Sequence, residues 1–252
     1  MSENDPNIIK IQDTSNIYKS DLTALEKLDG FSITGQSQKL RERMLTDQFI
    51  LNNIAIMGQW TNIYGAPNSG KTLITNWLLR TSILSEEIDG EKIYYVNADD
   101  TFRGNVEKAE LAENWGMKML YPGENDFTVG QLPDLMVELT VTKTARGRVL
   151  ILDTLKKFTQ LMDKRIASEF GILARSFISA GGTLICLAHT NKHVGADGKR
   201  IYSGTSDIVD DSDCNFVIDK ISKEERNGIE THTVEFTNIK ARGDVSSKVG
   251  FT

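Results

Sequence analysis

The residues of this chain with the clearest chemical potential form a short segment that is bordered by glycines and ends in a lysine and a threonine. In order, they are Gly65, Ala66, Pro67, Asn68, Ser69, Gly70, Lys71 and Thr72. The spacing G-x-x-x-x-G-K-[ST] is typical of a phosphate-binding loop, in which the glycines let the backbone fold around a phosphate. Lys71 can reach the β- and γ-phosphates of a nucleotide, and the Thr72 hydroxyl can bind Mg²⁺. A chance glycine-rich turn is the alternative.

Carboxylates follow two apolar runs of the chain. Asp153 comes directly after 149–152, and a carboxylate there suits the coordination shell of Mg²⁺, usually through water. Asp99 and Asp100 come shortly after 93–96, where a carboxylate can orient and deprotonate an attacking water. Capping of a following helix is the structural alternative for each of them. We expect Asp99 to be the catalytic carboxylate, with Asp100 as the other choice.

A histidine and a basic loop come after a further apolar run. His189 opens the segment 189–192, and a polar group at this position can touch the γ-phosphate and signal its presence to the next loop. A lone histidine is more often structural, so the position of His189 carries this argument. The loop at 193–207 contains glycines, Lys199 and Arg200, and a plain surface loop is its alternative interpretation.

Two cations near the end of the chain, Lys240 and Arg242, are separated by one residue. Alternate residues of a strand point the same way, so both can aim at one target. A cation that reaches the γ-phosphate of a neighbouring copy would stabilise the charge that develops during its transfer. The alternative is a solvated pair.

The elements that must position these residues alternate along the chain. Apolar, β-prone runs predict strands at 60–64, 93–96, 117–120, 149–152 and 183–188. Helices are expected near 73–79, 102–115, 129–144 and 164–180. This alternation predicts an α/β fold with a mostly parallel central sheet covered by helices on both faces. Ligands of such sheets bind at the carboxyl ends of the strands.

The two ends of the chain differ from this pattern. Residues 216–218 and 231–236, with a polar turn at 224–228 between them, predict a C-terminal antiparallel hairpin. Residues 1–30 are polar and are expected to form a mobile tail or an arm that packs on a neighbour. A short helix is expected at 36–47. We therefore divide the chain into an N-terminal arm, 1–47, and one α/β domain, 48–252.

Composition restricts the class of protein. The chain has 252 residues, a formal net charge of −6 and two cysteines. No apolar run is long enough to cross a bilayer and no secretory signal is visible, so a cytoplasmic protein with reduced, buried thiols and no membrane partner is expected. The acidic balance argues against a surface built for tight duplex binding, although a ring with a basic inner lining can be acidic outside.

Taken together, the motifs resemble those of the RecA-type ATPase superfamily. The resemblance is strongest to the RepA-family replicative helicases of plasmids and phages, with the DnaB-type helicases nearby. It covers residues 48–243 and includes the phosphate-binding loop together with 96–100, 150–153, 187–192 and 240–242, in the family's order.

The resemblance implies a set of roles for these residues. ATP would bind on Lys71 and Thr72, Mg²⁺ would be held by Thr72 and Asp153, and His189 would be the sensor of the γ-phosphate. Asp99 stands where these families usually have Glu, which is one methylene longer. This departure bears on the rate of hydrolysis.

The resemblance also implies an assembly. The family forms rings, commonly hexamers, in which a lysine and an arginine act across the subunit interface, here Lys240 and Arg242. Loops line a channel for single-stranded DNA, and the candidates in this chain are Lys192, Lys199 and Arg200.

Three functions follow as hypotheses. The first is an ATP-hydrolysing, ring-forming helicase on single-stranded DNA that works with a replication loader or a primase. The second is a RecA-like recombinase or single-strand annealing ATPase. The third is an ATP-dependent regulatory switch without helicase activity.

Overall fold

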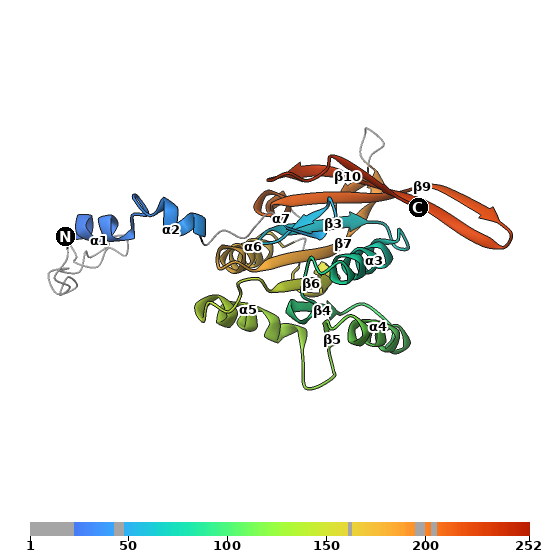
Figure 1. Ribbon diagram of the computed structural model, residues 1–252, viewed down its shortest axis with the longest axis horizontal. Helices are drawn as coiled ribbons and strands as arrows, with labels where there is room; N and C mark the ends of the chain where they lie inside the picture. Colours follow the sequence, from blue (N-terminus) through green and yellow to red (C-terminus); the bar gives the residue numbers. More distant parts are fainter. Residues whose placement is uncertain (1–22, 43–47, 161–162, 195–199, 203–205) are drawn as a thin grey trace, which may run out of the picture. The chain divides into compact units, whose positions relative to one another are not determined.

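Figure 1 shows the computed structural model of the chain, which describes residues 23–42, 48–160, 163–194, 200–202 and 206–252. The chain divides into two units, Met1–Met44 and Leu45–Thr252, which are described separately. Among the described residues, no helix is both long enough and apolar enough to span a bilayer.

The described part of the first unit contains two short helices, α1 (Ala24–Phe31) and α2 (Ser37–Glu42). Helix α2 confirms the first half of the helix expected at 36–47, and residues 43–47 lie outside the described residues. Helix α1 was not predicted. It begins with a capping box, in which the Thr23 hydroxyl accepts from the Glu26 N–H and the Glu26 carboxylate accepts from the Thr23 N–H. The spacing of Thr23 and Glu26 was the signal available for this helix.

The second unit is built on one large sheet. Its strands lie side by side in the order β11, β10, β9, β3, β7, β6, β4 and β5, and β8 pairs with β7. Their bounds are β3 (Trp60–Gly65), β4 (Ile93–Asn97), β5 (Lys118–Leu120), β6 (Val149–Asp153), β7 (Thr183–Val194), β8 (Arg200–Tyr202), β9 (Cys214–Arg226), β10 (Ile229–Ala241) and β11 (Lys248–Phe251). The pairs from β9 through β3, β7, β6 and β4 to β5 are parallel, and β10 is antiparallel to β9 and β11. The mostly parallel sheet and its C-terminal hairpin are therefore confirmed.

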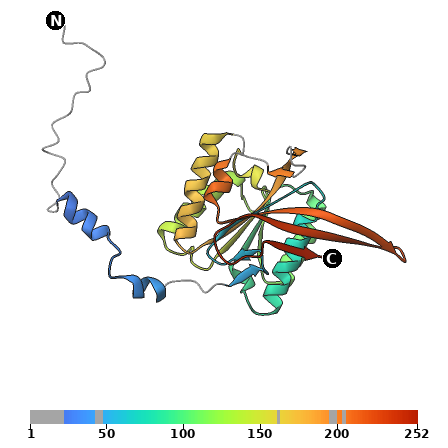
Figure 2. The same ribbon diagram turned by 90° about the horizontal axis from the view of Figure 1, so that it is seen from above.

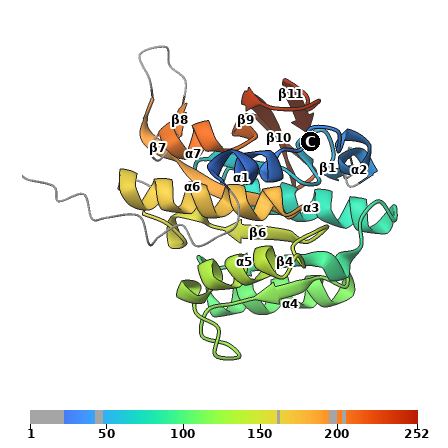
Figure 3. The ribbon, with the colours of Figure 1, turned by 90° about the vertical axis from the view of Figure 1, so that its left-hand side faces the viewer.

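Helices cover both faces of the sheet (Figure 2). Helices α3 (Lys71–Leu84) and α4 (Phe102–Asn114) pack on one face, and α5 (Leu132–Val141), α6 (Lys164–Ser179) and α7 (Ser206–Asp211) pack on the other. Figure 3 shows α5 and α6 side by side. Successive strand residues point to opposite faces of the sheet. Tyr95 of β4 therefore belongs to the hydrophobic core shared with α3 and α4, and Val96 to the core shared with α5, α6 and α7. The α/β fold with helices on both faces is thus confirmed.

Shorter elements complete the unit. Strands β1 (Phe49–Leu51) and β2 (Ala55–Ile56) form a small antiparallel sheet, and the buried residues of β1 share a core with α3. The 3₁₀ helices within the described residues are η2 (Gly90–Lys92), η3 (Val129–Gln131) and η4 (Leu155–Lys157). Helix η4 follows β6 directly and has a role in the site described below.

The structure corrects two strand boundaries that concern function. Strand β7 continues to Val194, so 189–192 lie within it rather than after it. The extension is possible because β8 pairs with it, which satisfies backbone groups that extend past the end of β3. Likewise, Lys240 lies inside β10, and β11 follows as a strand that was not predicted.

Candidate nucleotide-binding site

The register of the sheet brings the carboxyl ends of four strands together. Gly65, the last residue of β3, pairs with His189 of β7. Asp153, the last residue of β6, pairs with Asn97 of β4 and with Leu187 of β7. The loop, Asp153 and Asp99 therefore lie at or just after the ends of neighbouring strands, and His189, within the longer strand β7, lies level with the end of β3. Ligands of parallel sheets bind at these carboxyl ends.

The phosphate-binding loop has the backbone that its glycines allow. Gly70 has a φ of 92° and precedes the first residue of α3, and Asn68 also has a positive φ of 59°. A Cβ on Gly65 would collide with the side chains of Ile218 and Ser69. The buried Ser69 hydroxyl has no hydrogen-bond partner among the residues that the structure describes. A tight loop with an unsatisfied hydroxyl at the start of a helix fits an anionic phosphate as its ligand.

The lysine of the loop is folded into it. Lys71 as a residue is 7% exposed, and its ammonium donates to the carbonyl oxygens of Gly65 and Ala66, at 3.1 Å each. Burial lowers the pKa of Lys71, an effect that the charge of Asp153 opposes and the charge of Lys156 reinforces. Phosphate oxygens would offer this ammonium stronger, charge-assisted partners than the two carbonyls.

Thr72 and Asp153, predicted to hold Mg²⁺, lie in contact. The Thr72 hydroxyl donates to Asp153 Oδ2 at 3.0 Å, and the Tyr95 hydroxyl donates to the same oxygen at 2.6 Å. Burial, followed by the charge of Asp153, raises the pKa of Tyr95 well above its usual value, so this hydroxyl stays a donor. The capping alternative for Asp153 is wrong, since it ends β6 and the next residue, Thr154, holds the cap position of η4 without a side-chain bond.

A metal at this position would need other ligands as well. No group of three or more His, Cys, Asp or Glu side chains within the described ranges is arranged to hold a metal ion. A Mg²⁺ ion on the Thr72 hydroxyl and the Asp153 carboxylate would take its remaining ligands from phosphate oxygens and water, as this ion commonly does. The residues present therefore fit the expected cofactor.

Lys108 is a site residue that sequence reasoning missed. Its ammonium lies 3.0 Å from Asp100 Oδ2 and 3.6 Å from Asp153 Oδ2, and it donates to Asn97 Oδ1 at 3.1 Å. The side chain is only 17% exposed. Lys108 is on α4, outside every motif, and only the packing of that helix on the sheet brings it here.

Asp100 is engaged on the α4 side of the site. Besides its ion pair with Lys108, it accepts from the Thr101 N–H at 2.7 Å, and it packs so closely on Gly104 that a Cβ there would collide with it. Thr101, rather than either aspartate, caps α4 with its side chain. The capping alternative is therefore wrong for both Asp99 and Asp100.

Asp99 faces a different set of groups. Lys156 Nζ lies 3.0 Å from Asp99 Oδ2, Lys157 Nζ lies 3.3 Å from Oδ1, and His189 Nε2 lies 3.7 Å from Oδ2. Burial by itself would raise the pKa of Asp99, but the hydrogen bonds and charges of the two lysines outweigh it, and the pKa is lowered. Asp99 is therefore ionised at neutral pH. The two lysines, on η4, were missed because the sequence motif ends at Asp153.

His189 is neutral at neutral pH. Burial, followed by the charges of Lys71 and Lys156, lowers its pKa, and Asp99 only partly opposes this. Within the described part of the chain, its buried Nδ1 has no hydrogen-bond partner. The predicted sensor is thus placed beside the loop and the candidate catalytic carboxylate, with one ring nitrogen still available.

A cavity of about 870 Å³ adjoins the loop. One wall is the loop and the first turns of α3, and the other is formed by β9, β10 and β11. Its apolar lining consists of Leu73, Ile74, Trp77, Val234 and Phe251. The volume and the mixture of apolar and polar walls suit a nucleotide-sized ligand. Phe251 belongs to the strand that was not predicted.

Lys240 and Arg242 do share one target, as their spacing predicts, and it is the end of α7. The Lys240 ammonium donates to the carbonyl oxygens of Val209, Asp210 and Ser212, and Arg242 donates to that of Asp210 at 3.2 Å. The alternative of a solvated pair is therefore wrong, because both side chains donate to backbone carbonyls. Both cations close the carbonyl end of a short helix, where positive charge is stabilising.

These two cations lie near the amino end of β3, and the phosphate-binding loop begins at its carboxyl end. The Arg242 N–H donates to the Asp213 carbonyl at 2.7 Å, and the Asp213 N–H donates to that of Trp60, the first residue of β3. The loop begins at the other end of β3, about 16 Å away for a strand of this length. Within one chain, therefore, the structure does not bring Lys240 and Arg242 to the site of Lys71.

Two of the three candidate DNA-binding residues lie in the paired strands β7 and β8. Lys192 is on β7 and Arg200 begins β8, where it pairs with Val194. Lys199 lies outside the described residues. The basic loop expected at 193–207 is therefore in part a strand pair, and its last residues begin α7.

A scan against protein-family models and a search of curated proteins each found no match to this chain. The geometry of the site is thus the basis for assigning a function. This geometry is a glycine-bordered loop at the carboxyl ends of parallel strands, with carboxylates on the neighbouring strands.

Proposed function

We propose that this chain is an ATP-hydrolysing, ring-forming motor on single-stranded DNA, a replicative helicase of the RepA type within the RecA-type ATPases. One observation carries the proposal. The loop lysine, the Thr72–Asp153 pair, Asp99 and His189 converge at one strand edge, beside a cavity of nucleotide size. Each was expected from sequence to act on a different part of one triphosphate.

The proposed reaction is the hydrolysis of the γ-phosphate. Asp99 orients a water and accepts its proton as the water oxygen bonds to the γ-phosphorus. The bond from that phosphorus to the bridging oxygen breaks, and ADP leaves with the electron pair. Lys71 binds the phosphates, and a Mg²⁺ ion on Thr72 and Asp153 would neutralise charge on the β- and γ-phosphate oxygens.

The position of Lys240 and Arg242 is compatible with an assembly. Both lie at the edge of the sheet away from the loop of their own chain, so a phosphate contact by either would be to a neighbouring copy. Their bonds to α7 are within one chain, and an interface would have to exchange these carbonyl partners for phosphate oxygens.

The test is unwinding of a forked DNA by the full chain with ATP and Mg²⁺. We expect hydrolysis that single-stranded DNA stimulates and unwinding that requires it, with both lost in Asp153→Asn. This variant keeps the size of the side chain but removes the charge that faces Lys108 and Thr72. Unwinding that survives Asp153→Asn, or hydrolysis indifferent to DNA, would contradict the motor.

A second function, an ATP-dependent switch, is favoured by one specific observation. Asp99 is shorter than the usual glutamate and is paired to Lys156 and Lys157, which lowers its basicity. Such a site would bind ATP and turn over slowly. Hydrolysis that is slow and unchanged by DNA, with a conformational response to ATP, would be the result expected of a switch.

The two neighbouring aspartates are expected to differ in their effect on hydrolysis. Asp99→Asn removes the group that accepts the proton of water, and we expect about a 100-fold loss of rate. Asp100→Asn weakens only an ion pair with Lys108, and we expect a loss of a few-fold. Steady-state hydrolysis, with binding of a fluorescent ATP analogue as the control for the site, measures both. Equal losses in the two variants would show that the roles are not divided in this way.

A further inference from the structure

The two lysines of η4 bind opposite oxygens of one carboxylate. Lys156 pairs with Asp99 Oδ2 and Lys157 pairs with Asp99 Oδ1, and the two side chains are similarly exposed, at 46% and 44%. They follow Asp153 on the same segment of chain, so the strand end that presents the metal-binding carboxylate also presents them. As a pair, they form a natural comparison of two lysines with one shared partner.

Lys156 differs from Lys157 in what lies on its other side. His189 approaches the same Oδ2 oxygen of Asp99, at 3.7 Å, so Lys156 and the predicted sensor meet at one point. After burial, the charge of Lys156 also contributes to lowering the pKa of both Lys71 and His189. The ammonium of Lys156 therefore shares Asp99 Oδ2 with His189, and His189 pairs in the sheet with Gly65, the first residue of the loop.

This arrangement concentrates positive charge where a polyphosphate would end. The charges of two ammonium groups, Lys71 and Lys156, both lower the pKa of the partly buried His189, and the charge of Lys156 also lowers that of Lys71. In the chain alone, Lys71 is satisfied by backbone carbonyls and Lys156 by Asp99. A terminal phosphate, with its high charge, is a ligand that stabilises two such cations together.

We propose that Lys156 is a catalytic residue that contacts the terminal phosphate of a nucleotide bound in its own chain. The inference rests on the proposed function, since it assigns a further group to the same site. Lys156 transfers no proton. It neutralises charge on the phosphoryl oxygens as the water attacks and the bond to the bridging oxygen breaks, while Asp99 accepts the proton of water.

A phosphate contact by Lys156 and a passive ion pair with Asp99 predict opposite changes in the rate of hydrolysis when Lys156 is removed. If Lys156 only held Asp99 away from water, its removal would release Asp99 and hydrolysis would speed up. If Lys156 contacts the phosphate, its removal slows hydrolysis, and it weakens ATP binding more than ADP binding because only ATP has the third phosphate.

The experiment compares Lys156→Met with Lys157→Met in the full chain. Both variants remove one positive charge from Asp99, and only the first removes a charge beside Lys71 and His189. Single-turnover hydrolysis with Mg²⁺ is expected to slow about 100-fold in Lys156→Met and far less in Lys157→Met. In binding titrations, Lys156→Met should weaken ATP about tenfold with little change for ADP. Lys156→Arg, which keeps the charge, should recover part of the rate.

The possible results test the role of Lys156 and the proposed function separately. A rate in Lys156→Met equal to or above that of the wild type, or an equal loss in both methionine variants, would overturn the role of Lys156 and leave the proposed function standing. A wild-type chain that binds neither ATP nor ADP would overturn both. Thermal unfolding confirms that each variant is folded, which the exposure of the two side chains leads us to expect.

Discussion

Lys71→Ala is expected to abolish ATP hydrolysis, with a loss of about 10³-fold or more, and to weaken nucleotide binding. Lys71 is the buried cation of the loop, its ammonium is held by the Gly65 and Ala66 carbonyls, and the charge of Asp153 acts on it. Steady-state hydrolysis and titration with a fluorescent ATP analogue measure the two effects.

The same substitution is expected to leave the fold intact. The Lys71 ammonium bonds only to the carbonyls of Gly65 and Ala66, and burial of its charge is costly, as its lowered pKa indicates. Its removal relieves that cost. Lys118→Ala, which removes an exposed lysine on β5 at a distance from the loop, is the charge-matched control and should hydrolyse ATP at the wild-type rate. Hydrolysis by Lys71→Ala at a tenth of the wild-type rate would refute the assignment of the loop.

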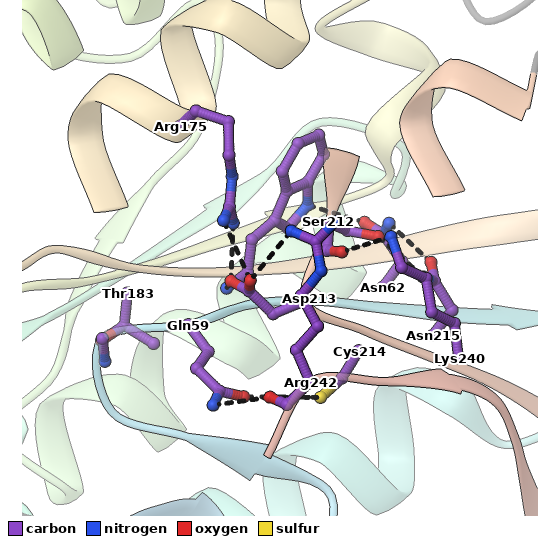
Figure 4. Close-up of polar contacts among 12 residues, drawn as sticks. Gln59, Asn62, Arg175, Thr183, Ser212, Asp213, Cys214, Asn215, Lys240 and Arg242 are labelled. Atoms are coloured by element: carbon purple, nitrogen blue, oxygen red, sulfur yellow. Dashed lines mark hydrogen bonds and ion pairs between the residues drawn. The ribbon is translucent and has the colours of Figure 1, made fainter. Parts of the chain in front are cut away.

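Asp213→Ala is expected to lower the free energy of unfolding by about 3 kcal/mol, the lower end of the range for a broken buried ion pair. Asp213 accepts two bonds from the Arg175 guanidinium, at 2.9 and 2.6 Å, and one from the Trp60 N–H at 2.9 Å (Figure 4). Removal of the carboxylate leaves these donors without their acceptor. The lower end applies because Arg175 is 31% exposed and keeps part of its hydration.

Urea-induced unfolding measures this change, and two variants sharpen it. Asp213→Asn keeps an acceptor for the Trp60 N–H but loses the charge facing Arg175, so it should fall between the wild type and Asp213→Ala. Arg175→Met leaves the Asp213 carboxylate buried and unpaired, apart from a 3.8 Å approach by Arg242, and should cost as much as Asp213→Ala. A loss below about 1 kcal/mol in Asp213→Ala would mean that water replaces the carboxylate there.

The Asp213 network also explains why Lys240 and Arg242 are held at the end of α7. Asp213 connects α6, through Arg175, to the first residue of β3, and its carbonyl accepts from the Arg242 N–H. Beside it, the buried Asn62 side chain donates to that of Asn215 at 2.9 Å, and Asn215 donates to Ser212 at 2.7 Å. Polar bonds in this buried region fix the two cations at the edge of the sheet away from their own loop.

Much of the fold and part of the site were determined by the sequence alone. The phosphate-binding loop is local, because its glycines, lysine and threonine act within one turn between a strand and a helix. The alternation of strands with amphipathic helices likewise sufficed for a mostly parallel sheet with two covered faces, as periodicity is a local property of each element. Asp153, Asp99 and His189 were found because the residues that end parallel strands meet at one edge.

Only the tertiary structure decided the rest. Lys108 reaches the carboxylates from α4, the η4 lysines turn back onto Asp99, and β11 supplies Phe251 to the cavity wall. The residues next to them in the sequence do not predict these contacts. Each contact depends on how a helix or strand packs against strands that are distant in the sequence. The edge occupied by Lys240 and Arg242 was equally hidden, because it follows from the register of β10 on β9 and of β9 on β3. The spacing of Lys240 and Arg242 in the sequence predicts that both side chains point the same way, whereas the pairing of β10, β9 and β3 determines where in the molecule they lie.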